Sequence, residues 1–117
     1  MANRVSGRKL GRKTGPRLAL YRTLTVAVLR YEQVKTTEAR AKEVRGRVEH
    51  MITLAKDGSL TARRRVVAEL PDEPLVIDKL FKEIAPRYAD RTSGYTRLVR
   101  IGLRSGDAAP IVQIELV

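Results

Sequence analysis

The chain has 117 residues, a length typical of one domain with a single hydrophobic core. Its 24 lysines and arginines outnumber 13 aspartates and glutamates, and the net charge of +11 and pI near 10.7 indicate a polyanionic partner. It has no cysteine, which excludes disulfides and cysteine-ligated metal sites, and no apolar run long enough to span a bilayer. We therefore expect a soluble, cytoplasmic protein with no membrane partner.

The positive charge is concentrated in the first part of the chain. Residues 1–47 hold 13 basic and 3 acidic side chains, whereas residues 48–117 hold 11 basic and 10 acidic ones. Residues 1–15 contain no acid and few apolar groups, so they cannot bury enough surface to offset the entropy of ordering them. We interpret residues 1–15 as a basic N-terminal arm, disordered when free, and residues 16–117 as a single compact domain.

Two long helices are expected at the start of this domain. The first covers residues 16–31, with Pro16 in the first turn, where its missing N–H costs nothing. Its apolar face, at helical spacing, is expected to comprise Leu20, Leu24, Ala27 or Val28, and Tyr31. The second helix is capped by Thr37 and ended by Gly58. Its apolar stripe has the clearest periodicity in the chain and comprises Ala41, Val44, Val48, Met51, Ile52 and Ala55.

Two shorter helices are expected between residues 59 and 86. Ser59 can cap a helix that stops at Pro71, with Leu60, Val67 and Leu70 facing inward. Asp72 and Pro74 then introduce another helix, which Pro86 stops. The inward residues expected for this helix are Ile77, Leu80, Phe81 and Ile84.

The C-terminal part of the chain has the alternation typical of strands. Apolar residues alternate with other residues over 99–103 and 112–116, and a turn at 105–107 joins them, so we expect an antiparallel hairpin. The β-prone segment 34–37 can supply the third strand that a stable sheet needs. The expected fold class is α+β (mixed α/β): about four helices packed on a small, three-stranded sheet with a C-terminal antiparallel hairpin. Strand order stays open.

The strongest candidate binding segment is the run Ser6-Gly7-Arg8-Lys9-Leu10-Gly11-Arg12-Lys13. Paired cations recur about four residues apart among glycines that let the backbone approach a phosphate closely. A solubilising or nucleolar-type tail is the alternative. RNA binding is favoured because the run is acid-free and leads directly into an aliphatic domain. The candidate contacts here are Arg4, Arg8, Lys9, Arg12, Lys13 and, at the start of the first helix, Arg17.

A second candidate is the loop over residues 87–97, in which two tyrosines are interleaved with three arginines. Tyrosine rings and guanidinium planes can stack on unpaired bases, and guanidinium groups bind phosphate. The alternative is an ordinary surface loop whose tyrosines pack back onto the sheet. The candidate RNA-binding residues are Arg87, Tyr88, Arg91, Tyr95 and Arg97.

Other features of the sequence argue against catalysis. The only histidine is His50, and no carboxylates have metal-ligand or acid–base spacing, so we expect no enzyme, metal, cofactor or small-molecule substrate. The arginines at 63–65 are interpreted as a solvated face, and those of the second helix as partners for neighbouring glutamates. A helix-turn-helix DNA-binding module and an RNA-cleaving enzyme are the rival classes, but the recognition helix and the catalytic cluster that they need are not evident.

Several stretches together resemble the L-seventeen family of bacterial-type large-subunit ribosomal proteins. They occur in order along nearly the whole chain: Ser6-Gly7-Arg8-Lys9-Leu10 with Arg12, Thr36-Thr37 leading to Ala41-Lys42-Glu43, Ile52-Thr53-Leu54-Ala55-Lys56, Leu80-Phe81, Pro86-Arg87-Tyr88, Gly94-Tyr95-Thr96-Arg97, Gly106-Asp107, Ala109-Pro110 and Glu115-Leu116-Val117. The chain departs from the family's usual residues at Ala2-Asn3, at Gly11 and at Gly15-Pro16-Arg17.

The resemblance implies a structural constituent of the large ribosomal subunit that binds and stabilises rRNA near the exit of the peptide tunnel. Its partners would be large-subunit rRNA and neighbouring large-subunit ribosomal proteins, and it would be a monomer within the ribosome. It also implies rRNA contacts by the 6–13 segment and by the 87–97 loop.

Overall fold

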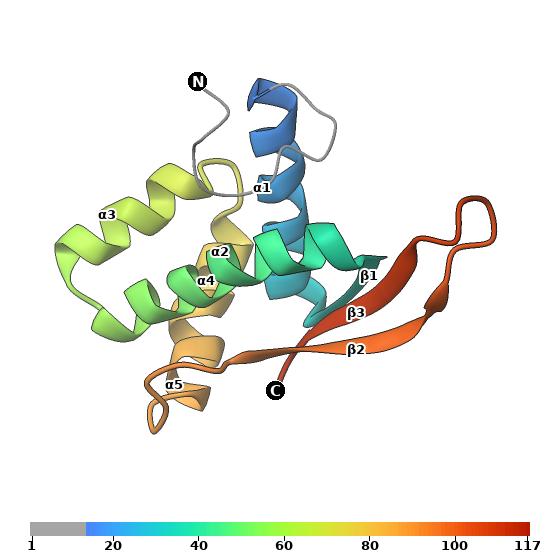
Figure 1. The fold of residues 1–117 in the computed structure, drawn as a ribbon. Helices are drawn as coiled ribbons and strands as arrows, with labels where there is room; N and C mark the ends of the chain where they lie inside the picture. Colours follow the sequence, from blue (N-terminus) through green and yellow to red (C-terminus); the bar gives the residue numbers. More distant parts are fainter. Residues whose placement is uncertain (1–13) are drawn as a thin grey trace, which may run out of the picture.

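The computed structural model describes residues 14–117, so the arm over residues 1–13 lies outside the described residues. Helices and strands follow in the expected order (Figure 1). The helical elements are α1 (Thr14–Tyr31), α2 (Glu38–Asp57), α3 (Leu60–Glu69), α4 (Pro74–Lys79), the π-helical turn η2 (Leu80–Ile84) and α5 (Ala85–Arg87). The strands are β1 (Gln33–Thr37), β2 (Thr96–Leu103) and β3 (Pro110–Leu116). The α+β class with a C-terminal hairpin is confirmed.

The sheet has three antiparallel strands in the order β1-β3-β2, which the sequence had left open. β3 is central and pairs with β1 from Gln33↔Glu115 to Thr37↔Ile111. Its pairing with β2 extends further, to Leu103↔Pro110, and is interrupted by a bulge between Arg100 and Gly102. The distal end of the hairpin therefore continues beyond β1 and projects away from the helices (Figure 1).

Helix α2 crosses the centre of the molecule and packs against α1, α3 and the sheet (Figure 1). Its six expected apolar residues are all buried, as the periodicity predicted. Thr37 caps its start by accepting from the backbone N–H of Arg40 at 3.5 Å, and Gly58 ends it in the left-handed conformation with φ of 69°. Local sequence signals thus determine both ends of the central helix.

Helix α1 begins at Thr14, two residues earlier than expected, and its inward face agrees with the prediction only in part: Val28 is buried and Leu24 packs against the core, but Tyr31 does not. Tyr31 is 65% exposed, and the buried side chains of α1 are Arg17, Tyr21, Thr25, Val28 and Leu29. The buried face includes polar residues because the Thr25 hydroxyl donates to the carbonyl of Tyr21 at 2.8 Å, one turn earlier. The spacing of apolar residues therefore predicted the buried face of α1 about one residue away from its position in the structure.

Helices α3 to α5 form the other end of the core. Ser59 caps α3 and Leu70 is buried, both as expected. Leu60 and Val67, however, are exposed, and Ala62 and Val66 are buried in their place. Pro86 does not stop the last helix, which continues to Arg87. The wide turn of η2, in which Ala85 N–H bonds to the carbonyl of Leu80, precedes the proline and relieves the clash expected in a regular α-helix. None of the described helices is long and apolar enough to cross a membrane.

Candidate nucleic-acid interface

The arm joins the folded domain directly at the start of α1. The candidate contacts Arg4, Arg8, Lys9, Arg12 and Lys13 lie outside the described residues, so they stay predictions. The arm is attached to the first turn of α1, which begins at Thr14. The first turns of α1 contain Arg17 and Tyr21 and pack against α2.

Four arginines and one histidine form a basic cluster where α1 crosses α2. Arg47 of α2 lies over the Tyr21 ring, with its guanidinium carbon 5.1 Å from the ring centroid. Burial is the largest influence on the Tyr21 hydroxyl, followed by Glu43, and both raise its pKa, whereas Arg17, Arg47 and Arg40 lower it. The charges of these three arginines therefore act on one ring. We call the group the basic cluster; its members are Arg17, Arg22, Arg40, Arg47 and His50.

The exposed side of the basic cluster is hollowed. Arg22, Arg47 and His50 line a hollow of about 90 Å³ together with Glu69, the acidic residue on its rim. Arg22 and His50 are exposed, Arg47 is half-buried, and Arg17 is only 7% exposed. Among the ion pairs found within residues 14–117, none includes Arg22 or Arg47. These two guanidinium groups are therefore available to phosphate oxygens.

The arginines of α3 are exposed, as the interpretation of a solvated face required. Arg63 covers the half-buried ring of Phe81, with its guanidinium carbon 4.5 Å from the ring centroid. Arg64 and Arg65 take no part in the ion pairs found within the described residues. Helix α3 thus adds positive charge, but one of its three arginines also covers the core.

The structure corrects the expectation that Tyr88 and Tyr95 offer rings for base stacking. Both rings are buried, with 2% and 1% exposure, and their centroids lie 5.2 Å apart. The Tyr88 hydroxyl donates to the carbonyl of Val117 at 2.7 Å, and the Tyr95 hydroxyl donates to that of Thr92 at 2.9 Å. The tyrosines pack inward because they close the core between α5 and the end of the sheet. The surface-loop alternative was therefore the correct one for these two residues.

The loop that carries the tyrosines is held to α2 by polar contacts. Glu49 accepts from the backbone N–H of Gly94 and of Thr96, both at 3.3 Å, and from the Thr96 hydroxyl at 2.8 Å. Lys56 donates to the Tyr95 hydroxyl at 3.0 Å and also to the carbonyl of Arg91. One acid and one base of α2 thus fix the conformation of this loop.

Arg87 joins the loop to the end of α1. Its guanidinium binds both carboxylate oxygens of Glu32, at 2.5 and 3.2 Å, and Lys79 lies 3.1 Å from the same carboxylate. The Arg87 hydrogen bond is the main cause that lowers the pKa of Glu32, to about 2. Glu32 also has a positive φ of 65°, and its backbone carbonyl accepts a hydrogen bond from Leu116 N–H at 2.9 Å. Arg87 is therefore part of a structural junction.

The other two arginines of the loop, Arg91 and Arg97, differ in their contacts within the chain. Arg97 pairs with Glu115 at 2.7 Å, although its side chain is 62% exposed. Arg91 is exposed and donates to the carbonyl of Gly94 at 3.1 Å. Neither contact decides whether these groups also bind RNA, so rRNA binding by Arg87, Arg91 and Arg97 stays a prediction.

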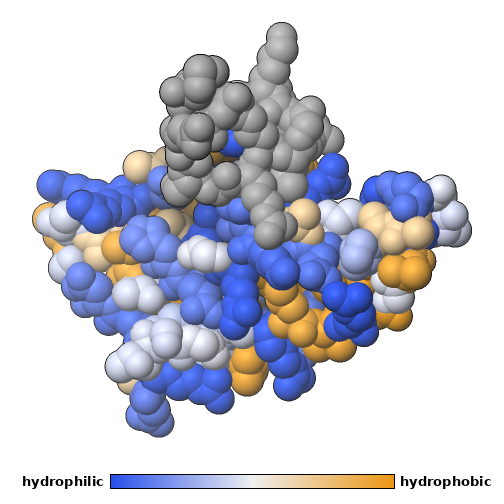
Figure 2. Space-filling model, viewed as in Figure 1, coloured by the Kyte–Doolittle hydropathy of each residue, from blue (hydrophilic) through white to orange (hydrophobic). Residues whose placement is uncertain are grey.

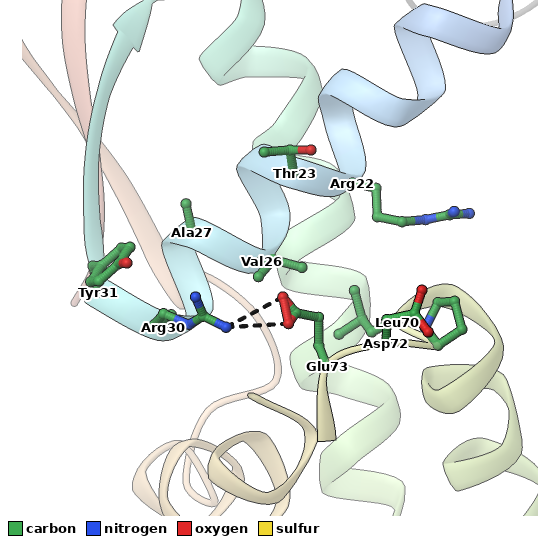
Figure 3. Close-up of a pocket in the computed structure, with 10 residues that line it drawn as sticks. Arg22, Thr23, Val26, Ala27, Arg30, Tyr31, Leu70, Asp72 and Glu73 are labelled. Atoms are coloured by element: carbon green, nitrogen blue, oxygen red, sulfur yellow. Dashed lines mark hydrogen bonds and ion pairs between the residues drawn. The ribbon is translucent and has the colours of Figure 1, made fainter. Parts of the chain in front are cut away.

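The largest pocket described, of about 430 Å³, lies between α1 and the segment that joins α3 to α4 (Figure 3). Its lining combines aliphatic residues with two arginines and two carboxylates, and Arg30 and Glu73 form an ion pair at 3.2 Å across one side (Figure 3). The carboxylates that line it, Asp72 and Glu73, are adjacent in sequence, and Glu73 is engaged by Arg30. In the part of the chain that the structure describes, no group of three acidic or histidine side chains is placed to hold a metal ion.

The basic cluster is the feature that reasoning from the sequence missed. Its residues come from positions 17 to 50, and only the packing of α1 on α2 brings Arg22 next to Arg47 and His50. The concentration of charge before residue 48 indicated the region, but not which side chains meet. The α2 arginines were expected to pair with glutamates, which holds for Arg45 and Glu49, 3.7 Å apart.

Comparison with known proteins shows the family. The model of the family described as ribosomal protein L17 matches residues 20–117. A protein of Desulfitobacterium hafniense named large ribosomal subunit protein bL17 is 56% identical over 110 residues, covering 94% of this chain and 97% of its own. The proteins of the same name from Caldanaerobacter subterraneus and Dehalococcoides mccartyi are 55% and 45% identical, covering 97% and 100% of this chain and 100% and 99% of their own.

These relatives are named as proteins of the large ribosomal subunit and not as enzymes, which confirms the non-catalytic class expected from the sequence. The matched residues include the two long helices, the π-helical turn and the hairpin, so the similarity covers the whole described fold apart from the first turns of α1. The chain therefore belongs to the ribosomal protein L17 family.

Proposed function

We propose that the chain is a structural component of the large ribosomal subunit that binds and stabilises rRNA. The observation that carries the proposal is the one-sided charge: residues 1–47 hold a net charge of +10, and the rest of the chain holds +1. Family membership supports a ribosomal role for this charge. The protein acts in the cytoplasm within the ribosome, as a monomer.

The arm and the basic cluster together form the main rRNA contact. The arm has five cations and no acid over residues 1–13, and it leads into α1, which also carries Arg22 of the basic cluster. Each cation that meets a phosphate displaces a condensed counterion, so affinity depends strongly on salt. Neutralising phosphates from two RNA segments lowers the repulsion between them and fixes one arrangement of the RNA. Arg17, close to the attachment point, orients this end of the domain.

The 87–97 loop contributes at most its arginines. Arg91 is exposed and can reach phosphate oxygens, whereas Arg87 is held by Glu32 and Arg97 by Glu115. The site near the exit of the peptide tunnel, next to other ribosomal proteins, follows from the resemblance to the family. The placement is compatible with a domain whose charged end enters RNA and whose opposite end is free for protein neighbours.

The experiment that tests this function measures binding of the full chain to large-subunit rRNA over a range of salt concentrations, with duplex DNA of equal length as the competitor. We expect a preference for rRNA, and co-sedimentation of the protein with large subunits in high salt. Equal affinity for duplex DNA, or loss of the protein from subunits at moderate salt, would contradict the proposal. Cryo-electron microscopy of the subunit would check its position at the tunnel exit.

A further inference from the structure

Tyr31, at the end of α1, is the one well-exposed aromatic ring of the chain. All five aromatic residues lie within residues 14–117, and the other four are buried or half-buried in the core. Tyr31 is 65% exposed, and its hydroxyl forms no hydrogen bond among the described residues. Hydrophilic residues predominate where α2 and α3 face the viewer in Figure 2, so that surface offers contacts to phosphate but no ring. A base that stacks on a side-chain ring of this domain therefore has Tyr31 to use.

Arg30 lies beside this ring and is fixed in place. Its guanidinium carbon is 5.9 Å from the Tyr31 ring centroid, and the same guanidinium binds both carboxylate oxygens of Glu73, at 3.2 and 3.3 Å. Lys79 also donates to the backbone carbonyl of Arg30 at 2.7 Å. Arg30 and Tyr31 both line the pocket of about 430 Å³ between α1 and residues 70–73. The exposed ring thus stands at a pocket with room for a flat ring system.

The α1 wall of this pocket leads to the basic cluster. Figure 3 shows Arg22 and Tyr31 towards opposite ends of that wall, with aliphatic residues between them. The step from residue 22 to residue 31 of a helix is about 13.5 Å, the length of about four stacked nucleotides. Arg22 also lines the smaller hollow of the basic cluster together with Arg47, so the two hollows adjoin at this arginine. A short unpaired strand along α1 can therefore place a phosphate at Arg22 and a base on Tyr31.

The opposite wall of the pocket determines which side of such a strand enters. Asp72 and Glu73 line it, and Asp72 takes part in none of the ion pairs found in the described part of the chain. Carboxylates repel phosphates but accept hydrogen bonds from the amino groups of bases. The phosphates are therefore directed to the α1 side and the bases into the pocket. A duplex does not fit this arrangement, because its bases are paired and stacked inside it.

We propose that an unpaired, single-stranded segment of RNA lies along α1, with a phosphate between Arg22 and Arg47 and one base stacked on Tyr31. The inference rests on the proposed function and deepens it. The arm and the basic cluster supply charge, which attracts single strands and duplexes alike, whereas Tyr31 adds recognition of an unpaired base. Stacking displaces no counterion, so its contribution to affinity is nearly independent of salt.

The test titrates the full chain with a single-stranded oligoadenylate of about eight nucleotides and with duplex RNA of the same length, at several salt concentrations. Tyr31→Ala removes the ring, and Tyr31→Phe retains it. The matched control is Leu75→Ala, because Leu75 is likewise exposed, at 79%, but lies on α4 and does not line the pocket. Both positions are exposed, so we expect all three variants to stay folded, which thermal unfolding would verify.

We expect Tyr31→Ala to bind the single strand roughly 5- to 150-fold more weakly than the wild type, with an unchanged salt slope, and to bind the duplex as the wild type does. Tyr31→Phe and the control should match the wild type on both RNAs. An unchanged affinity of Tyr31→Ala for the single strand, or an equal loss on the duplex, would overturn the proposal. Failure of the wild type to bind large-subunit rRNA in the same buffer would instead refute the proposed function, so the two failures are distinguishable.

A second measurement detects the stacking directly. The chain has no tryptophan, so Tyr31→Trp introduces a single indole whose emission can be followed alone. We expect the oligoadenylate to quench this emission as it binds, because a base covers the ring, and the duplex to leave it unchanged. Saturation with the oligoadenylate without quenching would contradict the assignment of Tyr31.

Discussion

The basic cluster and the β2–β3 hairpin contain similar numbers of arginines, but the arginines of the two regions differ in their ion pairing. In the cluster, Arg22 and Arg47 line an open hollow and take part in none of the ion pairs of residues 14–117. In the hairpin, all three arginines face a carboxylate within 2.7 Å. The comparison teaches that the number of arginines in a segment does not predict where RNA binds; their pairing in the folded chain does.

The largest effect is expected from removing the arm. Deleting residues 1–13 removes five cations and no acid, and α1 begins only at Thr14, so the domain should stay folded. The slope of log affinity for rRNA against log salt should become less steep by roughly 4, since each phosphate contact contributes about 0.7 to 0.9. Binding isotherms at several salt concentrations measure this. An unchanged slope would assign the RNA contact to another part of the molecule.

The next largest effect concerns Tyr88 in the 87–97 loop, whose ring is part of the hydrophobic core. Tyr88→Ala should lower the free energy of unfolding by about 3–5 kcal/mol, because it empties a buried ring position beside Tyr95. Tyr88→Phe should cost only about 1 kcal/mol, the hydrogen bond to Val117. Urea unfolding measures both values. If Tyr88→Ala weakened rRNA binding without loss of stability, the ring would be a base-stacking surface after all.

A smaller effect links stability to pH through Glu32. Its pKa of about 2 in the folded chain is below the ordinary 4.5, so its ion pairs stabilise the fold fully above pH 4.5 and are lost as pH falls towards 2. Because Glu32 is about one-third exposed, the contribution is limited to roughly 1 kcal/mol. Glu32→Gln should therefore be less stable than wild type at pH 7, and the difference should disappear near pH 2. A difference independent of pH would contradict the assignment.

The sequence predicted those parts of the fold that depend on local signals. The caps at Thr37, Ser59 and Gly58 and the stripe of α2 agree with the structure because each depends on residues within a few positions of one another. The inward face of α1 was predicted only in part, because Val28 and Leu24 pack inward as expected, but polar Thr25 is buried through a bond to its own helix and Tyr31 is exposed. Hydrophobicity contains no information on such local compensation.

The candidate site was harder to predict because its chemistry depends on long-range pairing. Tyr88 and Tyr95 have the composition of a stacking surface, yet their burial follows from packing against α2 and the C-terminal strand. Arg97 and Arg100 look like RNA contacts until Glu115 and Glu38 are found opposite them. The excess charge before residue 48 was visible in the sequence, and it correctly indicated the half of the chain that contains the basic cluster.

The central claim is that unpaired arginines, and not paired ones, bind rRNA, and one matched measurement tests it directly. The double variant R22Q/R47Q removes two charges from the basic cluster, and R97Q/R104Q removes the same number from the hairpin. The salt slope of rRNA affinity should fall by roughly 1.4 to 1.8 for the first variant and stay unchanged for the second. Equal falls in the two variants would contradict the claim.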